Sequence, residues 1–236
     1  MKPPPQPYLI YDLECTSKPE SELESLMPEF QASGVLKDPA KILADIAAKK
    51  QKWMDDAALS AITGQLLCIA ISESGNKGVI DGTEEEILRE FWNHCSSLKE
   101  ESAGACIFVG YNSHSFDLPW LIRKSWLLGV TVPSWLRRGR YFSDLCVDLR
   151  EVWQCGDRNE STGGLNGLAK AFGVGEKNGS GKHFGKLWNE DREAALAYAL
   201  QDIALTEAIA MKMGVIQSRS QEPVIIEQPE SDDFDY

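Results

Sequence analysis

The sequence lacks the features of several protein classes. It contains no run of roughly eighteen or more apolar residues, so no segment resembles a membrane-spanning helix. Its first residues include no apolar stretch followed by a small-residue cleavage site, which a secretory signal peptide would require. Its six cysteines form no Cys-x-x-Cys pair, which argues against a zinc site or a disulfide framework. We therefore expect a cytoplasmic protein with reduced thiols and no membrane contact.

The sequence also lacks a net positive charge. Its formal net charge of −12 argues against a general nucleic-acid coat protein, because phosphate affinity requires clustered lysine and arginine. The charge is uneven, however. Residues 119–188 contain eleven basic and six acidic residues, whereas residues 217–236 contain one basic and six acidic residues. One face of the protein can therefore be positive enough to bind a polymer of phosphates.

Hydrophobic patterning predicts one α/β domain with an arm and a tail. Strands are expected at 8–14, 65–72, 77–81, 105–111 and 143–147, and helices at 39–53, 84–98, 115–128, 148–152, 164–172 and 189–213. Strands that alternate with helices indicate a sheet covered on both sides. Residues 17–60 are expected to form an inserted arm, irregular as far as residue 30 and helical after residue 38. The polar, acidic residues 217–236 are expected to be disordered.

Two pairs of polar side chains occur at spacings that place each pair on one face of its element. Asp12 and Glu14 are two residues apart on the first predicted strand, so both leave the same face. Such carboxylates suit Mg²⁺ or Mn²⁺, although for this pair alone an exposed strand end is the more common explanation. Tyr198 and Asp202 are four residues apart on the last predicted helix and so are neighbours. On a packed helix this pair can also be a simple rim contact.

Asn112 and Asp117 lie between a predicted strand and a predicted helix. Each has an ordinary structural explanation, because asparagine favours turns and an aspartate in a first helical turn complements the helix dipole. Their place in the chain carries more information than either residue alone. The chain presents Asp-x-Glu on the first strand, Asn followed by Phe116-Asp117 after a central strand, and Tyr-x-x-x-Asp on the last helix.

This order of motifs resembles the three exonuclease motifs of the DEDD superfamily, in its tyrosine-bearing branch. The chain is similar in particular to the exonuclease domain of family-B DNA polymerases and to stand-alone prokaryotic and phage relatives. Segments 57–65 and 165–173 also resemble that family, and the resemblance extends over roughly residues 8–213. It implies a ribonuclease-H-like mixed sheet of about five strands flanked by helices. An exonuclease domain over residues 1–216, in a bacterial or phage-infected cell, is then expected.

The resemblance also implies an activity and residue roles. The expected activity is two-metal-ion 3′–5′ hydrolysis of DNA, with Mg²⁺ or Mn²⁺, that releases nucleoside monophosphates. Asp12, Glu14 and Asp202 would bind the ion that activates water, and Asp12 would bridge to a second ion supported by Asp117. Tyr198 would orient the water, because an unperturbed tyrosine stays neutral at working pH and is a poor base.

The residues expected to contact the substrate follow the family pattern less closely than the metal ligands do. In the resembled family a threonine usually follows the glutamate of the first motif, but here Cys15 takes that place and Thr16 comes next. Further substrate contacts are expected from Asn112 and Phe116. The basic, aromatic segment 135–142 suits a single strand through Arg137, Arg138 and Arg140, although a solvated loop would have the same composition. The glycine-rich segment 175–185 is either a flexible loop or a further contact through Lys177, Lys182, His183 and Lys186.

The last six residues combine acids with two aromatic side chains. They resemble the tip of bacterial single-stranded-DNA-binding proteins, which docks replication partners. A replication or repair protein is therefore one expected partner, and a solubilising tail is the plainer alternative. Two other functions fit the same motifs: an exoribonuclease of the same superfamily, and a catalytically silent nucleic-acid-binding or adaptor domain.

Overall fold

A five-stranded mixed sheet forms the centre of the computed structural model, which describes residues 6–136, 142–157, 159–161, 163–177, 179 and 181–217. The strands, in the order β3-β2-β1-β4-β5, are β1 (Tyr8–Ser17), β2 (Gly64–Glu73), β3 (Asn76–Asp81), β4 (Ile107–Gly110) and β5 (Cys146–Asp148). β2 runs antiparallel to both β1 and β3, whereas β4 runs parallel to both β1 and β5. The expected α/β fold with a mixed sheet is confirmed.

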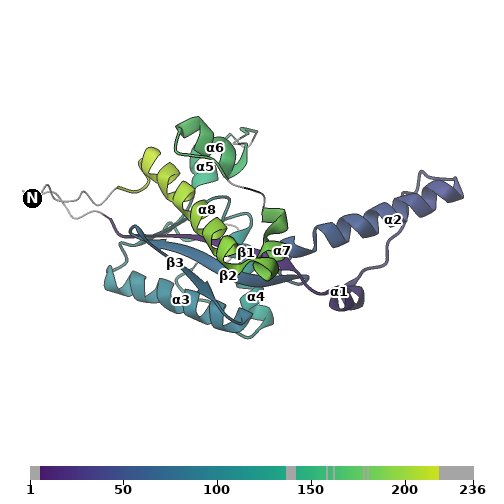
Figure 1. Cartoon of the computed structure of the whole chain (residues 1–236), viewed down its shortest axis with the longest axis horizontal. Coiled ribbons are helices and arrows are strands. Elements are labelled where there is room, and N and C mark those ends of the chain that lie inside the picture. Colours follow the sequence, from purple (N-terminus) through teal and green to yellow (C-terminus); the bar gives the residue numbers. More distant parts are fainter. Residues whose placement is uncertain are drawn as a thin grey trace, which may run out of the picture.

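Helices cover both faces of this sheet (Figure 1). They are α1 (Glu20–Leu26), α2 (Pro39–Asp55), α3 (Glu84–Glu101), α4 (Asp117–Leu127), α5 (Leu149–Gln154), α6 (Gly164–Phe172), α7 (Phe184–Glu190) and α8 (Arg192–Lys212), with 3₁₀ turns η1 (Ala57–Leu59) and η2 (Gly181–His183). α8 crosses one face of the sheet and α3 lies on the other (Figure 1). The start of α3 is fixed by a capping box, in which Thr83 and Glu86 bond each other's backbone N–H groups.

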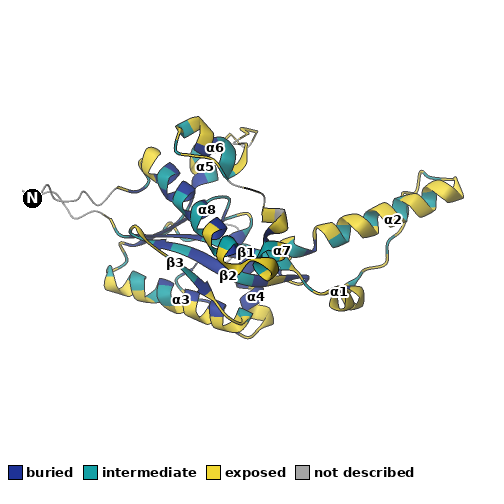
Figure 2. Ribbon diagram, in the orientation of Figure 1, coloured by how far each residue is buried: buried dark blue, intermediate teal, exposed yellow. Residues whose placement is uncertain are grey.

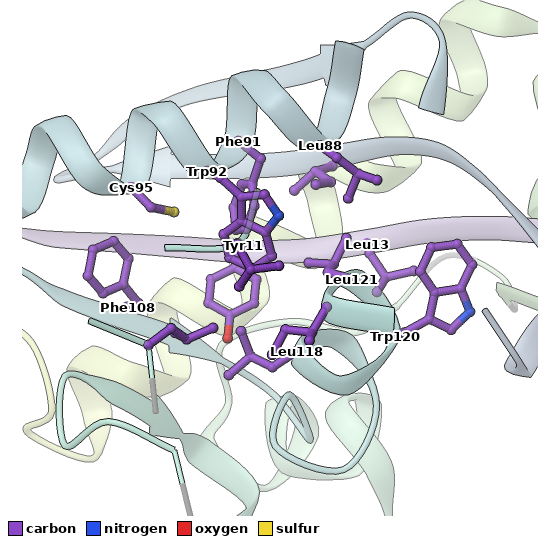
Figure 3. Packing of buried hydrophobic residues seen from close by; sticks show 14 of the residues in the cluster. Tyr11, Leu13, Leu88, Phe91, Trp92, Cys95, Phe108, Leu118, Trp120 and Leu121 are labelled. Atoms are coloured by element: carbon purple, nitrogen blue, oxygen red, sulfur yellow. The ribbon is translucent and has the colours of Figure 1, made fainter. Parts of the chain in front are cut away.

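Side chains along β1 alternate between two hydrophobic cores. Leu9, Tyr11 and Leu13 face α3 and α4, where they pack with Phe91 and Trp120 (Figure 3). Residues of the opposite parity, such as Tyr8 and Ile10, belong to the core beneath α8. Complete burial of such side chains stabilises the fold by roughly 1.5–3 kcal/mol each. The same alternation puts the next two residues of this parity, Asp12 and Glu14, on the face that α8 covers.

A buried polar network fixes the position of α8 on the sheet. Glu207 is 5% exposed, and its Oε1 accepts hydrogen bonds from Tyr8 Oη at 3.0 Å and Ser72 Oγ at 2.8 Å. Its Oε2 lies 2.8 Å from Lys77 Nζ. A buried carboxylate is tolerated only with such partners, so the register of the helix against β1, β2 and β3 is strongly specified. Tyr198 and Asp202 lie on the same helix, within about two and a half turns of this anchor.

The arm extends away from the sheet, and no residue of α2 is buried (Figures 1 and 2). It is held together by its own contacts. The rings of Phe30 and Trp53 meet edge to face at 6.4 Å, and Ser33 N donates to Asp45 Oδ2 at 2.9 Å. The helix expected after residue 38 is confirmed, with Asp38 as its N-cap. The prediction of irregular chain as far as residue 30 was wrong, because α1 forms within it.

The region before α8 also differs from the prediction. One helix was expected from 189 to 213, after a glycine-rich loop ending at 185. Instead, η2 forms inside the expected loop, and α7 ends before α8 begins. Asp191 separates the two helices and caps α8, because its side chain accepts a hydrogen bond from Ala194 N at 3.0 Å. By length and composition α8 could cross a membrane, but 56% of the tested stretch is buried inside the fold, as in a core helix of a soluble protein. Residues 218–236 of the predicted tail lie outside the described residues.

Candidate active site

Three carboxylates from two distant parts of the chain converge beneath α8. Asp12 and Glu14 come from β1 and Asp202 from α8, and one oxygen from each lies within 4.8 Å of the others. The three carboxylates come together because side chains alternate along β1 and because the Glu207 network fixes α8 on the sheet. The structure therefore brings together the three residues expected to hold the first metal ion.

Burial and mutual repulsion disturb the ionisation of these three groups. Burial, followed by the charge of Asp202, raises the pKa of Asp12 to about 7. Burial, followed by the charge of Asp12, raises the pKa of Glu14. Burial also raises the pKa of Asp202. Like charges at such distances each favour the neutral form of their neighbour, so the cluster calls for a compensating cation.

The donor set fits a hard divalent cation. Asp202 is 1% exposed, and its carboxylate interacts with the side chains of Lys177 and Tyr198. A buried carboxylate is costly unless positive charge meets it. Lys177 supplies one positive charge through an ion pair with Asp202. Three carboxylates against one ammonium still leave negative charge, and Mg²⁺ and Mn²⁺ prefer such oxygen ligands.

Asp117 lies beside this cluster at the start of α4. It is 3% exposed, and its Oδ1 accepts a hydrogen bond from Leu13 N at 3.2 Å, within the Asp-x-Glu motif itself. Burial, and then the charge of Asp12, raise the pKa of its carboxyl group. Its position suits the supporting role expected for it, beside Asp12 and outside the group of three.

Tyr198 faces the cluster from α8, one turn before Asp202. Its ring packs on Phe184 of α7, and the ammonium of Lys177 lies 5.2 Å from the ring centroid. Its hydroxyl group is enclosed, and it interacts with the ammonium group of Lys177 and the carboxylate of Asp202. Burial raises its pKa to about 12, so the group stays neutral near pH 7. A neutral hydroxyl group at this place can still bond a water molecule or a substrate oxygen, because a hydroxyl oxygen offers one donor and two acceptor sites.

A pocket of about 570 Å³ opens on one side of the carboxylates, between the end of β1 and the base of the arm. Thr16 lines it, and α7 approaches so closely that a Cβ at Gly185 would lie 2.2 Å from Thr16 Oγ1. Cys15 also lines it, and its thiol donates to Ala58 O at 3.3 Å. Cys15, which takes the place of the usual threonine, is thus hydrogen-bonded to the base of the arm, and Thr16 lies beside α7.

A second pocket, of about 490 Å³, opens on the other side. Asn112 and Phe116 line it, as expected for substrate contacts. Asn112 adopts a positive φ of 59°, and its Oδ1 accepts from Arg150 Nη1 at 2.7 Å. Asp148 fixes this corner, because its carboxylate accepts the backbone N–H groups of Asn112, His114 and Arg150 at 2.8–2.9 Å.

Three predicted substrate-binding residues lie outside the described part of the chain, and the sequence did not single out two residues beside the site. Arg137, Arg138 and Arg140 lie outside the described residues. Lys177 was only one of several cations in a glycine-rich segment, and no local pattern distinguished it. Arg150 was not predicted to belong to the site, although a cation two residues after the strand at 146–148 was a usable signal.

A second group of possible metal ligands has a structural explanation. His114, Asp148 and Glu151 offer atoms within 4.8 Å of one another. His114 Nδ1 lies 2.8 Å from Glu151 Oε2, its Nε2 lies 3.2 Å from Cys146 O, and Asp148 already accepts three backbone N–H groups. These contacts satisfy the cluster without an ion.

Comparison with known proteins identifies the family. Residues 68–225 match a family described as a predicted 3′–5′ exonuclease related to the exonuclease domain of PolB. The chain belongs to this family. The match includes Asp117, Tyr198 and Asp202 but begins after Asp12 and Glu14, so the structure is what joins β1 to the other motifs. A comparison with curated protein sequences finds no match.

The fold is similar to part of a solved polymerase. The family B DNA polymerase from the hyperthermophilic archaeon Pyrobaculum calidifontis matches 89% of this chain with a TM-score of 0.56 and 20% identity. The chain covers 25% of that polymerase, so it spans about a quarter of its length. The likeness establishes an exonuclease-domain fold of the ribonuclease-H-like type.

Proposed function

We propose that this family member is a divalent-metal-dependent exonuclease that removes nucleoside 5′-monophosphates from the 3′ end of DNA. The observation that carries the proposal is the convergence of Asp12, Glu14 and Asp202, with Asp117 and Tyr198 directly beside them. Phosphodiester hydrolysis requires a positioned water molecule and relief of negative charge on the attacking and leaving oxygens. This arrangement of side chains can meet both requirements.

Each residue then has a distinct role. Asp12, Glu14 and Asp202 would hold one ion, and Asp12 would share a second ion that Asp117 supports. When bound, Mg²⁺ or Mn²⁺ would neutralise charge on the phosphate and favour deprotonation of the attacking water. Tyr198 would orient that water through its neutral hydroxyl group. The new bond joins the water oxygen to phosphorus, and the bond to the 3′ oxygen of the preceding nucleotide breaks.

Lys177 would provide further positive charge next to the scissile phosphate. Burial alone would lower its pKa, but the contacts with Asp202 and Tyr198 together outweigh burial, so the pKa is raised and the ammonium group stays charged. Charges fixed in a half-buried site stabilise a transition state more strongly than the same charges in water.

DNA is proposed over RNA because the related exonuclease domain and the solved relative both belong to DNA polymerases. A cytoplasmic location in a bacterial or phage-infected cell is proposed with it, supported by six cysteines that are all free thiols. A contact between the acidic tail and a replication or repair protein also remains a proposal. Deleting residues 217–236 should weaken capture of such a partner and leave turnover of short oligonucleotides unchanged.

Matched 5′-labelled DNA and RNA oligonucleotides, incubated with Mg²⁺ or Mn²⁺, test the proposed function. We expect a ladder of DNA fragments shortened one nucleotide at a time, and slower shortening of RNA. Faster cleavage of RNA would make the protein an exoribonuclease. Binding without shortening of either polymer would identify a silent adaptor domain.

A further inference from the structure

The two pockets beside the carboxylates differ in charge. Both are lined by Asp12, Phe116 and Lys177, so they form two arms of one depression with the acidic cluster between them. The pocket near the arm base adds four carboxylates, Glu14, Asp55, Asp56 and Asp202. The pocket near α5 and α6 adds one carboxylate, Asp117, and one guanidinium group, Arg150. The depression therefore has an acidic side and a side with an arginine.

Arg150 is held in place before any substrate binds. Its backbone N–H donates to Asp148 Oδ1 at 2.9 Å, and its Nη1 donates to Asn112 Oδ1 at 2.7 Å. Asp148 is 2% exposed, and Asn112 is constrained by its positive φ. A guanidinium group has five N–H donors, and among the described residues one of them is engaged by Asn112. The remaining donors are available at the pocket wall.

The charge difference gives the substrate a direction. A nucleic-acid strand carries a phosphate at every linkage, whereas the nucleoside beyond the scissile phosphate at a 3′ end carries none. A bound ion would offset the charges of Glu14 and Asp202, which leaves Asp55 and the Lys52-paired Asp56 as the acids of the arm base. The backbone should therefore avoid that side and follow the side with the arginine, because like charges at short range are unfavourable. The terminal nucleoside, with its neutral base, is the part of the strand that the acidic pocket can accept.

We propose that Arg150 binds the phosphodiester group one linkage upstream of the scissile one and thereby positions the strand. The 3′-terminal nucleoside then lies between the end of β1 and the arm base, and the rest of the strand leaves across α5 and α6. Arginine suits this task, because its planar fork bonds phosphate oxygens in pairs. Arg150 is a positioning residue in this scheme, and the inference rests on the proposed function.

A binding cycle tests the contact without requiring hydrolysis. The affinity of a 5′-fluorescein single-stranded oligonucleotide is measured by anisotropy with Ca²⁺, for the wild type and for Arg150→Gln. Each protein is tested with an all-phosphate strand and with a strand whose penultimate linkage is a neutral methylphosphonate. We expect the neutral linkage to weaken wild-type binding about 10-fold to 100-fold, as loss of a charged hydrogen bond should. Arg150→Gln should show the same loss on the all-phosphate strand and no further loss on the modified one.

Controls separate this contact from other effects. Arg89→Gln, on the exposed face of α3 and paired with Glu85, should bind both strands like the wild type. Arg150→Lys keeps the positive charge but lacks the paired N–H donors of a guanidinium group. Its affinity for the all-phosphate strand should therefore lie between those of the wild type and Arg150→Gln. Independent, additive losses from the variant and the neutral linkage would overturn the proposal, as would full affinity in Arg150→Gln. Strands that bind as expected but are never shortened would refute the proposed function alone.

Discussion

The ammonium group of Lys177 forms an ion pair with the buried carboxylate of Asp202. The two residues come from different parts of the fold, Lys177 from the segment after α6 and Asp202 from the middle of α8. The carboxylate that Lys177 contacts is also one of the three expected to hold a metal ion. Under the proposed function, Lys177 and the metal ion would compete for Asp202, and both would bring positive charge to the same place.

Replacing Lys177 with glutamine should separate these two effects. Mn²⁺ binding, measured by calorimetry, should be unchanged or tighter, because a competitor for Asp202 is removed. The rate of nucleotide release should fall by about 100-fold, since a fixed charge near the phosphate is lost. Lys170→Gln is a matched control, because Lys170 pairs with Glu176 on the exposed side of α6. Weaker Mn²⁺ binding together with normal turnover would contradict this assignment.

Removing one hydroxyl group tests the role of Tyr198. Tyr198→Phe should retain metal and DNA binding and lose about 100-fold in turnover, because only the positioning of water is affected. Tyr8→Phe removes another buried hydroxyl group, one that bonds Glu207 away from the cluster. That variant should lose about 1 kcal/mol of unfolding free energy and keep its activity. A wild-type rate in Tyr198→Phe would remove this residue from the catalytic set.

The repulsion within the cluster predicts a trade-off between stability and function. Glu14→Gln should make the metal-free protein more stable at pH 8 by about 1–2 kcal/mol, because it removes a buried charge beside Asp12 and Asp202. Because burial and neighbouring charge raise the pKa of Glu14 in the folded state, ionising this group costs more there than in the unfolded state. The penalty therefore grows as pH rises above the unfolded value, and the gain should vanish near pH 4.

Urea unfolding with a chelator, at both pH values, measures this difference. Addition of Mn²⁺ should then stabilise the wild type more than Glu14→Gln, because the variant lacks one of the metal's ligands. A variant that is less stable than the wild type at pH 8 without metal would show that the carboxylates are not in conflict.

The environment of Cys15 predicts low reactivity despite its place at the site. Burial and the charge of Glu14 raise the pKa of its thiol, and the thiol donates to Ala58 O. Because the thiolate is the reactive form, iodoacetamide at pH 8 should modify exposed Cys155 well before Cys15. Peptide mass spectrometry over a time course measures both rates. Equal rates would indicate that the contact between Cys15 and the arm base is not persistent.

Local patterns predicted the parts of the site that depend on local geometry. The two-residue spacing of Asp12 and Glu14 fixed their common face, and the four-residue spacing of Tyr198 and Asp202 fixed theirs. The apolar run at 8–11 predicted the strand, and the structure buries both of its faces, one of them beneath α8. The choice of which face meets α8 depends on helix packing and on the Glu207 network, which no local pattern shows.

The remainder of the site depends on contacts between distant segments. α7 and α8 are separate helices because Asp191 caps the start of α8. A single capping residue inside a run of helix-forming residues is a weak signal in a sequence. Lys177 precedes α7, and α7 lies against β1, as the close approach of Gly185 to Thr16 shows. The guanidinium group of Arg150 is held by Asn112, which lies 38 residues away in the sequence.

The most direct test of the central claim is degradation of 5′-labelled single-stranded DNA by the wild type and by Asp12→Ala. Asp12 belongs to the group of three carboxylates and is the ligand expected to be shared between two ions. We expect the wild type to produce a ladder that shortens from the 3′ end with Mg²⁺ or Mn²⁺ and stops when a chelator is added. Asp12→Ala, folded by circular dichroism, should leave the strand intact under the same conditions. Full activity in Asp12→Ala would contradict the account.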